Sequence, residues 1–169
     1  MRTRDAILPD AVKIHRLIST HYETGTLLPR SLPELCENVR DFKVIEDAGR
    51  IVGCGALHLY GMHLAEIRSI AVDPAYQRAG LGVLLVKSLM RSARKHHVTG
   101  VCLFTRIPEF FSRLGFSIVS REQLPDKLYK DCCECPRFHC CDEVAMLRGE
   151  IPSVSIFHPL QPALVKLQA

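Results

Sequence analysis

The stretch that most constrains this chain runs from Glu66 to Gly82 and combines a strand, a glycine-bearing loop and the start of a helix. Residues 66–72 are rich in apolar and β-branched side chains, which favours a strand. Asp73 and Pro74 end it, because proline has no N–H for the ladder. A helix that begins after such a loop exposes backbone N–H groups at its N-terminus, so the stretch predicts a site for a phosphate or pyrophosphate.

The spacing within the loop narrows the class of ligand. It matches neither the Walker P-loop pattern nor the G-x-G-x-x-G pattern of dinucleotide-binding folds. The residues are Gln77-Arg78-x-Gly80-x-Gly82. The glycines let the backbone approach a pyrophosphate closely, and Gln77 and Arg78 add side-chain donors. The alternative is a glycine-containing turn that only caps an ordinary helix.

Composition excludes several classes of protein. With 169 residues, 47% hydrophobic and 24% charged, the chain suits one globular domain with a sizeable core. Its formal net charge of +4 favours anionic ligands but is too small and too scattered for nucleic acid. No apolar run reaches the roughly 18 residues that span a bilayer. No export signal follows Met1, so we expect a cytoplasmic protein with reduced cysteines.

The periodicity along the chain predicts an α+β protein with a mixed sheet and the order β-α-α-β-β-β-loop-α-β-α-β-β. The predicted strands are 4–8, 42–46, 51–60, 66–72, 101–104, 116–119 and 143–147, with the last at the sheet edge. Helices are predicted over 10–22, 32–40, 83–96 and 109–114. Residues 1–149 form the predicted domain. Residues 150–169 are expected to be an extended or disordered C-terminal extension.

Two further expectations concern the central strand. Because side chains alternate along a strand, Glu66, Arg68, Ile70 and Val72 are predicted to project to one face. In the preceding strand, Gly53 and Gly55 predict a bulge or a close backbone approach.

Two motifs resemble the GNAT acetyltransferase superfamily. Residues 77–82 resemble its acyl-coenzyme A pyrophosphate loop, Gln/Arg-x-x-Gly-x-Gly/Ala, and residues 110–116 (Phe-Phe-Ser-Arg-Leu-Gly-Phe) resemble its F-Y-E-K-L-G-F segment. The predicted element order is that of the GNAT fold, here with a Cys-rich insert before the last strand. The resemblance implies acetyl-CoA as co-substrate. Its contacts would be the main chain of Ile70 and Val72 and the loop residues Gln77, Arg78, Gly80, Leu81 and Gly82.

A narrower resemblance is to N-acetylglutamate synthases and covers about residues 4–148. Residues 27–31 resemble the segment L-V-x-R-S of these enzymes, and residues 51–57 resemble I-x-x-C-A-A-L. Residues 66–72 resemble a strand that contains G-E, residues 103–106 resemble L-T-T-R, and residues 124–125 match a Leu-Pro pair. The insert at 132–141 resembles that of short, single-domain bacterial relatives. The amino-acid-kinase-like domain of long-form synthases has no counterpart here, so their arginine feedback site is not assumed.

The family resemblance implies acetyl transfer to the α-amine of glutamate. An amine attacks a thioester carbonyl directly, so no cysteine nucleophile is required. Several GNAT enzymes place a carboxylate where Glu66 stands, and we predict that Glu66 is the general base. The alternative is a structural ion pair with Arg68 or with a cation of another strand. Arg30 and Arg106 stand where the family contacts substrate, and guanidinium groups bind carboxylates well. We predict that they hold glutamate, with one arginine per carboxylate or both near one end. The alternative is two solvated loop arginines.

One departure from the family concerns the general acid. Many GNAT enzymes protonate the leaving thiolate with a tyrosine at the position occupied here by Phe111. Tyr76 and Tyr129 are candidates for that role, and unassisted departure of the thiolate is the other reading.

The cysteine-rich insert has metal-ligand spacing. Cys132 and Cys135 form C-x-x-C, and Cys141, Cys140 or His139 could complete a tetrahedral structural zinc site. Against zinc, the chain has only one C-x-x-C, and the ligands would crowd one loop. Free thiols are the favoured alternative, ahead of a disulfide.

The sequence therefore predicts a glutamate N-acetyltransferase at the entry step of arginine biosynthesis. One alternative is a GNAT enzyme that acts on glutamine or another small amine, because the fold defines the donor better than the acceptor. Another is a non-catalytic acetyl-CoA-binding regulatory module. The expected partners are small-molecule substrates, with a homodimer left open, and neither nucleic acid nor a membrane.

Overall fold

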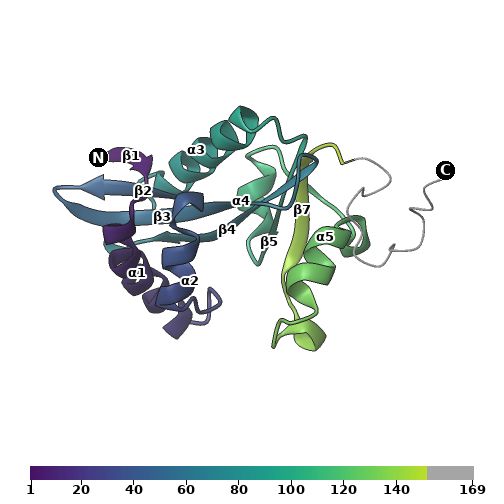
Figure 1. The fold of residues 1–169 in the computed structure, drawn as a ribbon, viewed down its shortest axis with the longest axis horizontal. Coiled ribbons are helices and arrows are strands. Elements are labelled where there is room, and N and C mark those ends of the chain that lie inside the picture. Colours follow the sequence, from purple (N-terminus) through teal and green to yellow (C-terminus); the bar gives the residue numbers. More distant parts are fainter. Residues whose placement is uncertain (152–169) are drawn as a thin grey trace, which may run out of the picture.

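The computed structural model describes residues 1–151, which form a mixed sheet of seven strands with helices on both faces (Figure 1). The strands lie in the order β1-β2-β3-β4-β5-β7-β6. All neighbours are antiparallel except β4 and β5, which are parallel. Their bounds are β1 Arg2–Asp5, β2 Phe42–Asp47, β3 Arg50–Leu59, β4 Leu64–Val72, β5 Gly100–Thr105, β6 Ser117–Ile118 and β7 Val144–Gly149. The predicted α+β class with a mixed sheet is confirmed.

The α-helices are α1 Ala11–Glu23, α2 Leu32–Glu37, α3 Leu81–Lys95, α4 Pro108–Ser112 and α5 Pro125–Lys127. In Figure 1, α1 and α2 lie on one side of the sheet and α3 lies on the other. Among residues 1–151, no helix is both long enough and apolar enough to cross a membrane. The predicted C-terminal extension falls almost wholly on residues 152–169, outside the described residues.

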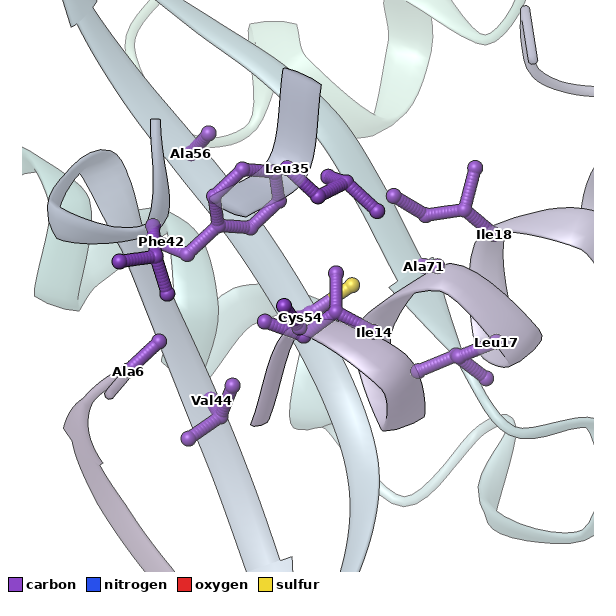
Figure 2. Close-up of a cluster of buried hydrophobic side chains, with 12 residues drawn as sticks. Ala6, Ile14, Leu17, Ile18, Leu35, Phe42, Val44, Cys54, Ala56 and Ala71 are labelled. Carbon is purple, nitrogen blue, oxygen red and sulfur yellow. The ribbon is translucent and has the colours of Figure 1, made fainter. Parts of the chain in front are cut away.

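The first core lies between α1, α2 and the N-terminal half of the sheet (Figure 2). Helix α1 contributes Ile14, Leu17 and Ile18, whose spacing places them on one side of the helix. They face inward-pointing residues of β2 and β3, among them Val44 and Cys54. Complete burial of an aliphatic side chain of this size stabilises a fold by about 1.5–3 kcal/mol. These contacts hold the segment that follows α1 close to the end of β4.

The second core lies under α3. Its helix residues Val86, Leu89 and Met90 pack with Leu57, Ile67 and other side chains from β3, β4, β5 and α4. A smaller cluster of Ile45, Val52, Leu81 and Leu85 packs the first turn of α3 against β2 and β3. Because this turn is packed so closely, the loop that precedes α3 is anchored at its helical end.

Two local features define where elements begin and turn. The Ser31 side chain accepts a hydrogen bond from the N–H of Glu34 at 3.3 Å and caps α2. The turn between β2 and β3 has positive φ at Ala48 (46°) and Gly49 (79°), as a two-residue hairpin turn requires.

Two expectations about the sheet are wrong. Strand β7 is not an edge strand: it pairs with β5 on one side and β6 on the other. The edge is β6, which has only two residues. Strand β1 spans Arg2–Asp5 rather than residues 4–8, because Leu8–Asp10 form a 3₁₀ turn that leads into α1. Alternation and apolarity alone predicted these strands but not their neighbours in the sheet.

Candidate active site

Strands β4 and β5 separate after only three paired positions. The pairs are Leu64 with Gly100, Ala65 with Val101 and Glu66 with Cys102, although β4 continues to Val72 and β5 to Thr105. Beyond Glu66 the two strands no longer share a ladder. Main-chain groups and side chains of both C-terminal halves are therefore available to a cleft between them.

A β-bulge lies in β4 just beyond this point. The pairing of β3 with β4 shifts by one residue, so that Ser69 and Ile70 both face Gly55. Ser69 has a φ of 54°, in the left-handed region. A Cβ at position 55 would lie 3.2 Å from atoms of Ile70 and of Leu89 in α3. The close approach predicted from Gly53 and Gly55 is confirmed at Gly55, and the bulge lies opposite it, in β4.

The bulge overturns the prediction that four side chains of β4 share a face. Glu66 and Arg68 alternate with Ala65 and Ile67, which pack under α3. Beyond the bulge, Ile70 and Val72 themselves pack toward α3. One additional residue in a strand reverses its alternation. The carboxylate of Glu66 and the side chains of Ile70 and Val72 therefore lie on opposite faces of the sheet.

The larger of two cavities at the separated strands has a volume of about 690 Å³. Its wall is formed by the end of β4, the loop before α3, and the β5–α4 connection. All the residues predicted to contact the coenzyme line this cavity: Ile70, Val72, Gln77, Arg78, Gly80, Leu81 and Gly82. The structure brings this whole predicted set together.

The loop before α3 has a defined conformation. The Asp73 side chain accepts a hydrogen bond from the N–H of Ala75 at 2.9 Å and so shapes the turn that ends β4. Arg78 and Gly80 have φ values of 65° and 76°. Gly80 is the N-cap of α3, and its carbonyl accepts the first helical hydrogen bond, from Leu84. The N–H groups before Leu84, in the first turn of α3, have no partner within the helix. These N–H groups and the helix dipole both favour an anion at this end.

The smaller cavity has a volume of about 350 Å³ and meets the larger one at the separated strands. Residues that line both are Leu27, Ile67, Arg68, Ser69, Phe104 and Glu143. Charged groups of both signs line the smaller cavity: Arg30, Glu66, Arg68, Arg121, Lys127, Lys130, Asp131, Glu134 and Glu143. A ligand in the larger cavity and a ligand in the smaller cavity would therefore meet at this junction.

Glu66 lies in the wall of the smaller cavity and is only 3% exposed. Its carboxylate forms an ion pair with Lys127 Nζ, 2.9 Å from Oε1, and Oε2 accepts a hydrogen bond from the Tyr60 hydroxyl at 2.9 Å. Arg68 Nη1 lies 3.9 Å from Glu66 Oε2. Asp131 Oδ2 also contacts the Tyr60 hydroxyl oxygen and accepts a hydrogen bond from Lys127 Nζ at 3.0 Å. The ion pair considered from the sequence is present, with Lys127 of α5 as the closest cation.

This cluster changes the ionisation of its members. Burial lowers the pKa of Lys127, but the attraction of Glu66 and Asp131 outweighs it and raises the pKa above its ordinary value. Burial likewise opposes ionisation of Asp131. Hydrogen bonding from Tyr60 and the charges of Lys127 and Arg68 nevertheless hold the pKa of Asp131 below its ordinary value. Lys127 and Asp131 are therefore both charged at neutral pH.

The two predicted substrate arginines line different cavities. Arg30 lines the smaller cavity and pairs with Glu34 one turn along. Arg106 lines the larger cavity and pairs with Asp142 at 2.8 Å. Its Nη1 also donates to the carbonyls of Gly25 (3.4 Å) and Thr26 (3.2 Å). Arg106 thus connects the α1–α2 loop, β5 and the segment before β7.

Sequence reasoning missed four residues of the site, of which Lys127 and Asp131 line the smaller cavity and His21 lines the larger one. Glu66 is surrounded by Lys127, Tyr60 and Asp131. The only local sequence signal for this cluster was the four-residue spacing of Lys127 and Asp131, which suits an ion pair along a helix. The fourth residue is His21 of α1, which lines the larger cavity. Its Nε2 donates to the Val72 carbonyl at 2.9 Å, which ties α1 to the end of β4.

The cysteine insert does not support the zinc prediction. Cys132, Cys135 and Cys141 all line the smaller cavity. Among residues 1–151, however, no three His, Cys, Asp or Glu side chains are grouped so that they could hold one metal ion. The insert contains two separate helical turns, Leu128–Cys132 and Phe138–Cys140. All eight cysteines lie within residues 1–151, and none of them forms a disulfide there. Burial raises the pKa of Cys132 to about 11, so this thiol stays protonated at neutral pH.

The structure also places the candidates for a general acid. Phe111 is 7% exposed and packs edge-on against Phe116, so it belongs to the core under α3. Tyr76 lines the larger cavity, and its hydroxyl donates to Asp47 at 3.0 Å. Tyr129 lines neither of the two cavities.

Comparisons with known proteins agree with this architecture. The acetyltransferase (GNAT) domain family matches residues 38–118. An uncharacterized N-acetyltransferase of Chlorobaculum tepidum is 37% identical over 145 residues, covering 86% of this chain and 94% of that protein. An amino-acid acetyltransferase of Mycobacterium tuberculosis is 36% identical over 133 residues, covering 77% of this chain and 76% of that protein.

A solved structure shows the same fold. It is N-acetylglutamate synthase from Neisseria gonorrhoeae, complexed with coenzyme A and N-acetyl-glutamate, with a TM-score of 0.79 and 28% identity. The match covers 88% of this chain but only 34% of that longer one. On the fold, the family match and the extent of these similarities, the chain belongs to the GNAT family of acetyltransferases and is an acyltransferase.

Proposed function

We propose that this protein transfers the acetyl group of acetyl-CoA to the α-amine of L-glutamate. The observation that carries the proposal is the junction of the two cavities at the separated strands β4 and β5. The glycine loop lines one cavity and Glu66 lines the other. Relatives named amino-acid acetyltransferase, and a matching synthase solved with coenzyme A and N-acetyl-glutamate, support the choice of donor and acceptor.

In the proposed reaction, the amides at the start of α3 bind the pyrophosphate of acetyl-CoA. The pantetheine arm lies along the unpaired half of β4, near Ile70 and Val72, and brings the thioester to the junction. The acceptor occupies the smaller cavity, where Arg30 binds a carboxylate and Glu66 removes a proton from the amine. The amine nitrogen then attacks the thioester carbonyl, and the thiolate of coenzyme A leaves. Such an enzyme would serve arginine biosynthesis in the cytoplasm.

An assay of coenzyme A release with a panel of amino acids tests this function. We expect glutamate to have a kcat/KM at least about tenfold above those of glutamine and aspartate, since a charged hydrogen bond contributes roughly 1.5–3 kcal/mol. A higher value for glutamine would transfer the proposal to that acceptor. Binding of acetyl-CoA without turnover of any amino acid would instead indicate a non-catalytic module.

The two arginines give a second prediction. Arg30→Ala is expected to raise the KM for glutamate about tenfold or more and to leave the KM for acetyl-CoA nearly unchanged, because Arg30 lines only the smaller cavity. If Arg106 also binds the acceptor, Arg106→Ala will show the same split. If it mainly holds the loop at Gly25 and Thr26, both KM values will rise together. Steady-state kinetics with each substrate varied in turn separate the outcomes, and an unchanged glutamate KM for Arg30→Ala contradicts the role of Arg30.

A further inference from the structure

The hydroxyl of Tyr60 lies between two carboxylates. Its oxygen is 2.9 Å from Glu66 Oε2 and is also hydrogen-bonded to Asp131 Oδ2. A phenol has one proton, so it donates to one carboxylate at a time. The contact with the other carboxylate becomes a hydrogen bond only when that carboxyl group carries a proton of its own. The three groups thus form a chain that accommodates one additional proton.

The two ends of this chain differ in exposure. The Glu66 side chain is 4% exposed, and Tyr60 is 6% exposed. The Asp131 side chain is 31% exposed and stands at the solvent side of the cluster. A base at Glu66 must release the proton that it accepts before it can act again. Its own access to solvent is small, and an acceptor in the smaller cavity would reduce it further.

Cations flank both carboxylates of the chain. Lys127 Nζ lies 3.0 Å from Glu66 Oε2 and 3.0 Å from Asp131 Oδ2, and Arg68 lies within 4 Å of both carboxylates. Burial and the negative charge of Glu66 raise the pKa of Tyr60, which keeps the phenol protonated. A proton that reaches Asp131 is readily lost to solvent, because the groups around it favour its ionised form.

We propose that Tyr60 and Asp131 form the route by which Glu66 returns its proton to solvent during turnover. This inference rests on the proposed function, in which Glu66 accepts a proton from the amine. The O–H bond of protonated Glu66 then breaks as its proton passes to the Tyr60 oxygen. At the same time the original O–H bond of Tyr60 breaks, and that proton passes to Asp131. Asp131 releases it to water, Glu66 is again a carboxylate, and Tyr60 is again a neutral phenol.

The Tyr60→Phe variant tests this route because it keeps the ring that packs beside Leu64 and Leu124. We expect kcat to fall about tenfold with saturating substrates, while both KM values change less than about twofold. Proton release then limits turnover, so the kcat ratio between H₂O and D₂O rises above that of the parent enzyme. Imidazole, a small proton carrier, is expected to restore part of the lost kcat as its concentration is raised.

Asp131→Asn provides a second variant with the same readouts, since Asp131 is at the surface of the cluster and the fold tolerates change there more readily. In a shared route, the double variant is no slower than about the slower single one. Tyr22→Phe is the matched control, because Tyr22 is 51% exposed and lines neither cavity.

The outcomes separate the route from the proposed base. Loss of activity in Glu66→Gln, together with imidazole-dependent recovery in Tyr60→Phe, supports both. Loss of activity in Glu66→Gln with a parental kcat in Tyr60→Phe and Asp131→Asn overturns the route alone. A slow Tyr60→Phe enzyme with no response to imidazole and no larger isotope effect also overturns it, because Tyr60 then acts only in packing. Full activity in Glu66→Gln overturns the base itself.

Discussion

Replacing Gly82 with Asp is expected to abolish tight binding of coenzyme A while leaving the fold intact. The new carboxylate would stand in the first turn of α3, in the wall of the larger cavity, where the pyrophosphate is proposed to lie. Two like charges about 4 Å apart repel by about 4 kcal/mol at an effective dielectric constant of about 20. We therefore expect the Kd for coenzyme A, measured by calorimetry, to rise at least about 30-fold, or about 2 kcal/mol.

The fold should tolerate this change because an acidic side chain is favourable at a helix N-terminus. A Cβ at position 82 would lie 3.3 Å from the ζ carbon of Phe110, a side chain that can shift slightly. Gly82→Ala makes the same contact without the charge and separates crowding from repulsion. Gly49→Asp adds the same charge in the hairpin turn, outside the larger cavity. A Cβ there would meet nothing within 4 Å, and the strain of a side chain at its φ of 79° lowers stability without affecting the coenzyme site. If Gly82→Asp bound coenzyme A as tightly as Gly49→Asp, the pyrophosphate could not lie at this helix end.

The second large effect concerns the proton on the amine. Glu66→Gln is expected to lower kcat by roughly 10²–10⁴, the usual contribution of a positioned general base. The amide keeps the size of the side chain and can still accept the hydrogen bond from Tyr60. Binding of coenzyme A should not change, because Glu66 does not line the larger cavity. Single-turnover kinetics and calorimetry on the same preparation measure the two quantities.

A comparison variant distinguishes a base from a structural ion pair. Lys127→Met removes the closest cation of Glu66 but leaves its carboxylate. If Glu66 only balances charge, the two variants should lose similar stability and similar activity, since each breaks the same buried pair. If Glu66 is the base, Glu66→Gln should lose far more kcat than its loss of stability explains. Equal losses of kcat in the two variants would contradict the role of base.

The coenzyme side of the site was predictable because its signals are local. Asp73 and Pro74 end a strand, and the glycines at 80 and 82 permit a left-handed residue and a close approach next to a helix start. Such properties belong to a run of adjacent residues and are visible in it. The loop therefore lines the cavity with every residue that the motif predicted.

The acceptor side was less predictable because its contacts join distant parts of the chain. Lys127 stands 61 residues beyond Glu66, and Asp131 stands 71 residues beyond Tyr60. No spacing in the sequence connects residues so far apart. The predicted pairing of Arg30 with Arg106 around one ligand also depended on tertiary placement, and the structure assigns them to different cavities.

The sequence by itself determined the order of the main elements, the glycine loop and the GNAT resemblance, since periodicity, turn residues and motifs are properties of neighbouring positions. Only the tertiary structure decided where β4 and β5 separate and where Ser69 bulges. It also decided which groups surround Glu66. The bulge shows the physical reason: one unpaired residue reverses the faces of a strand, yet it depends on the strand beside it and leaves the apolar pattern of its own segment unchanged.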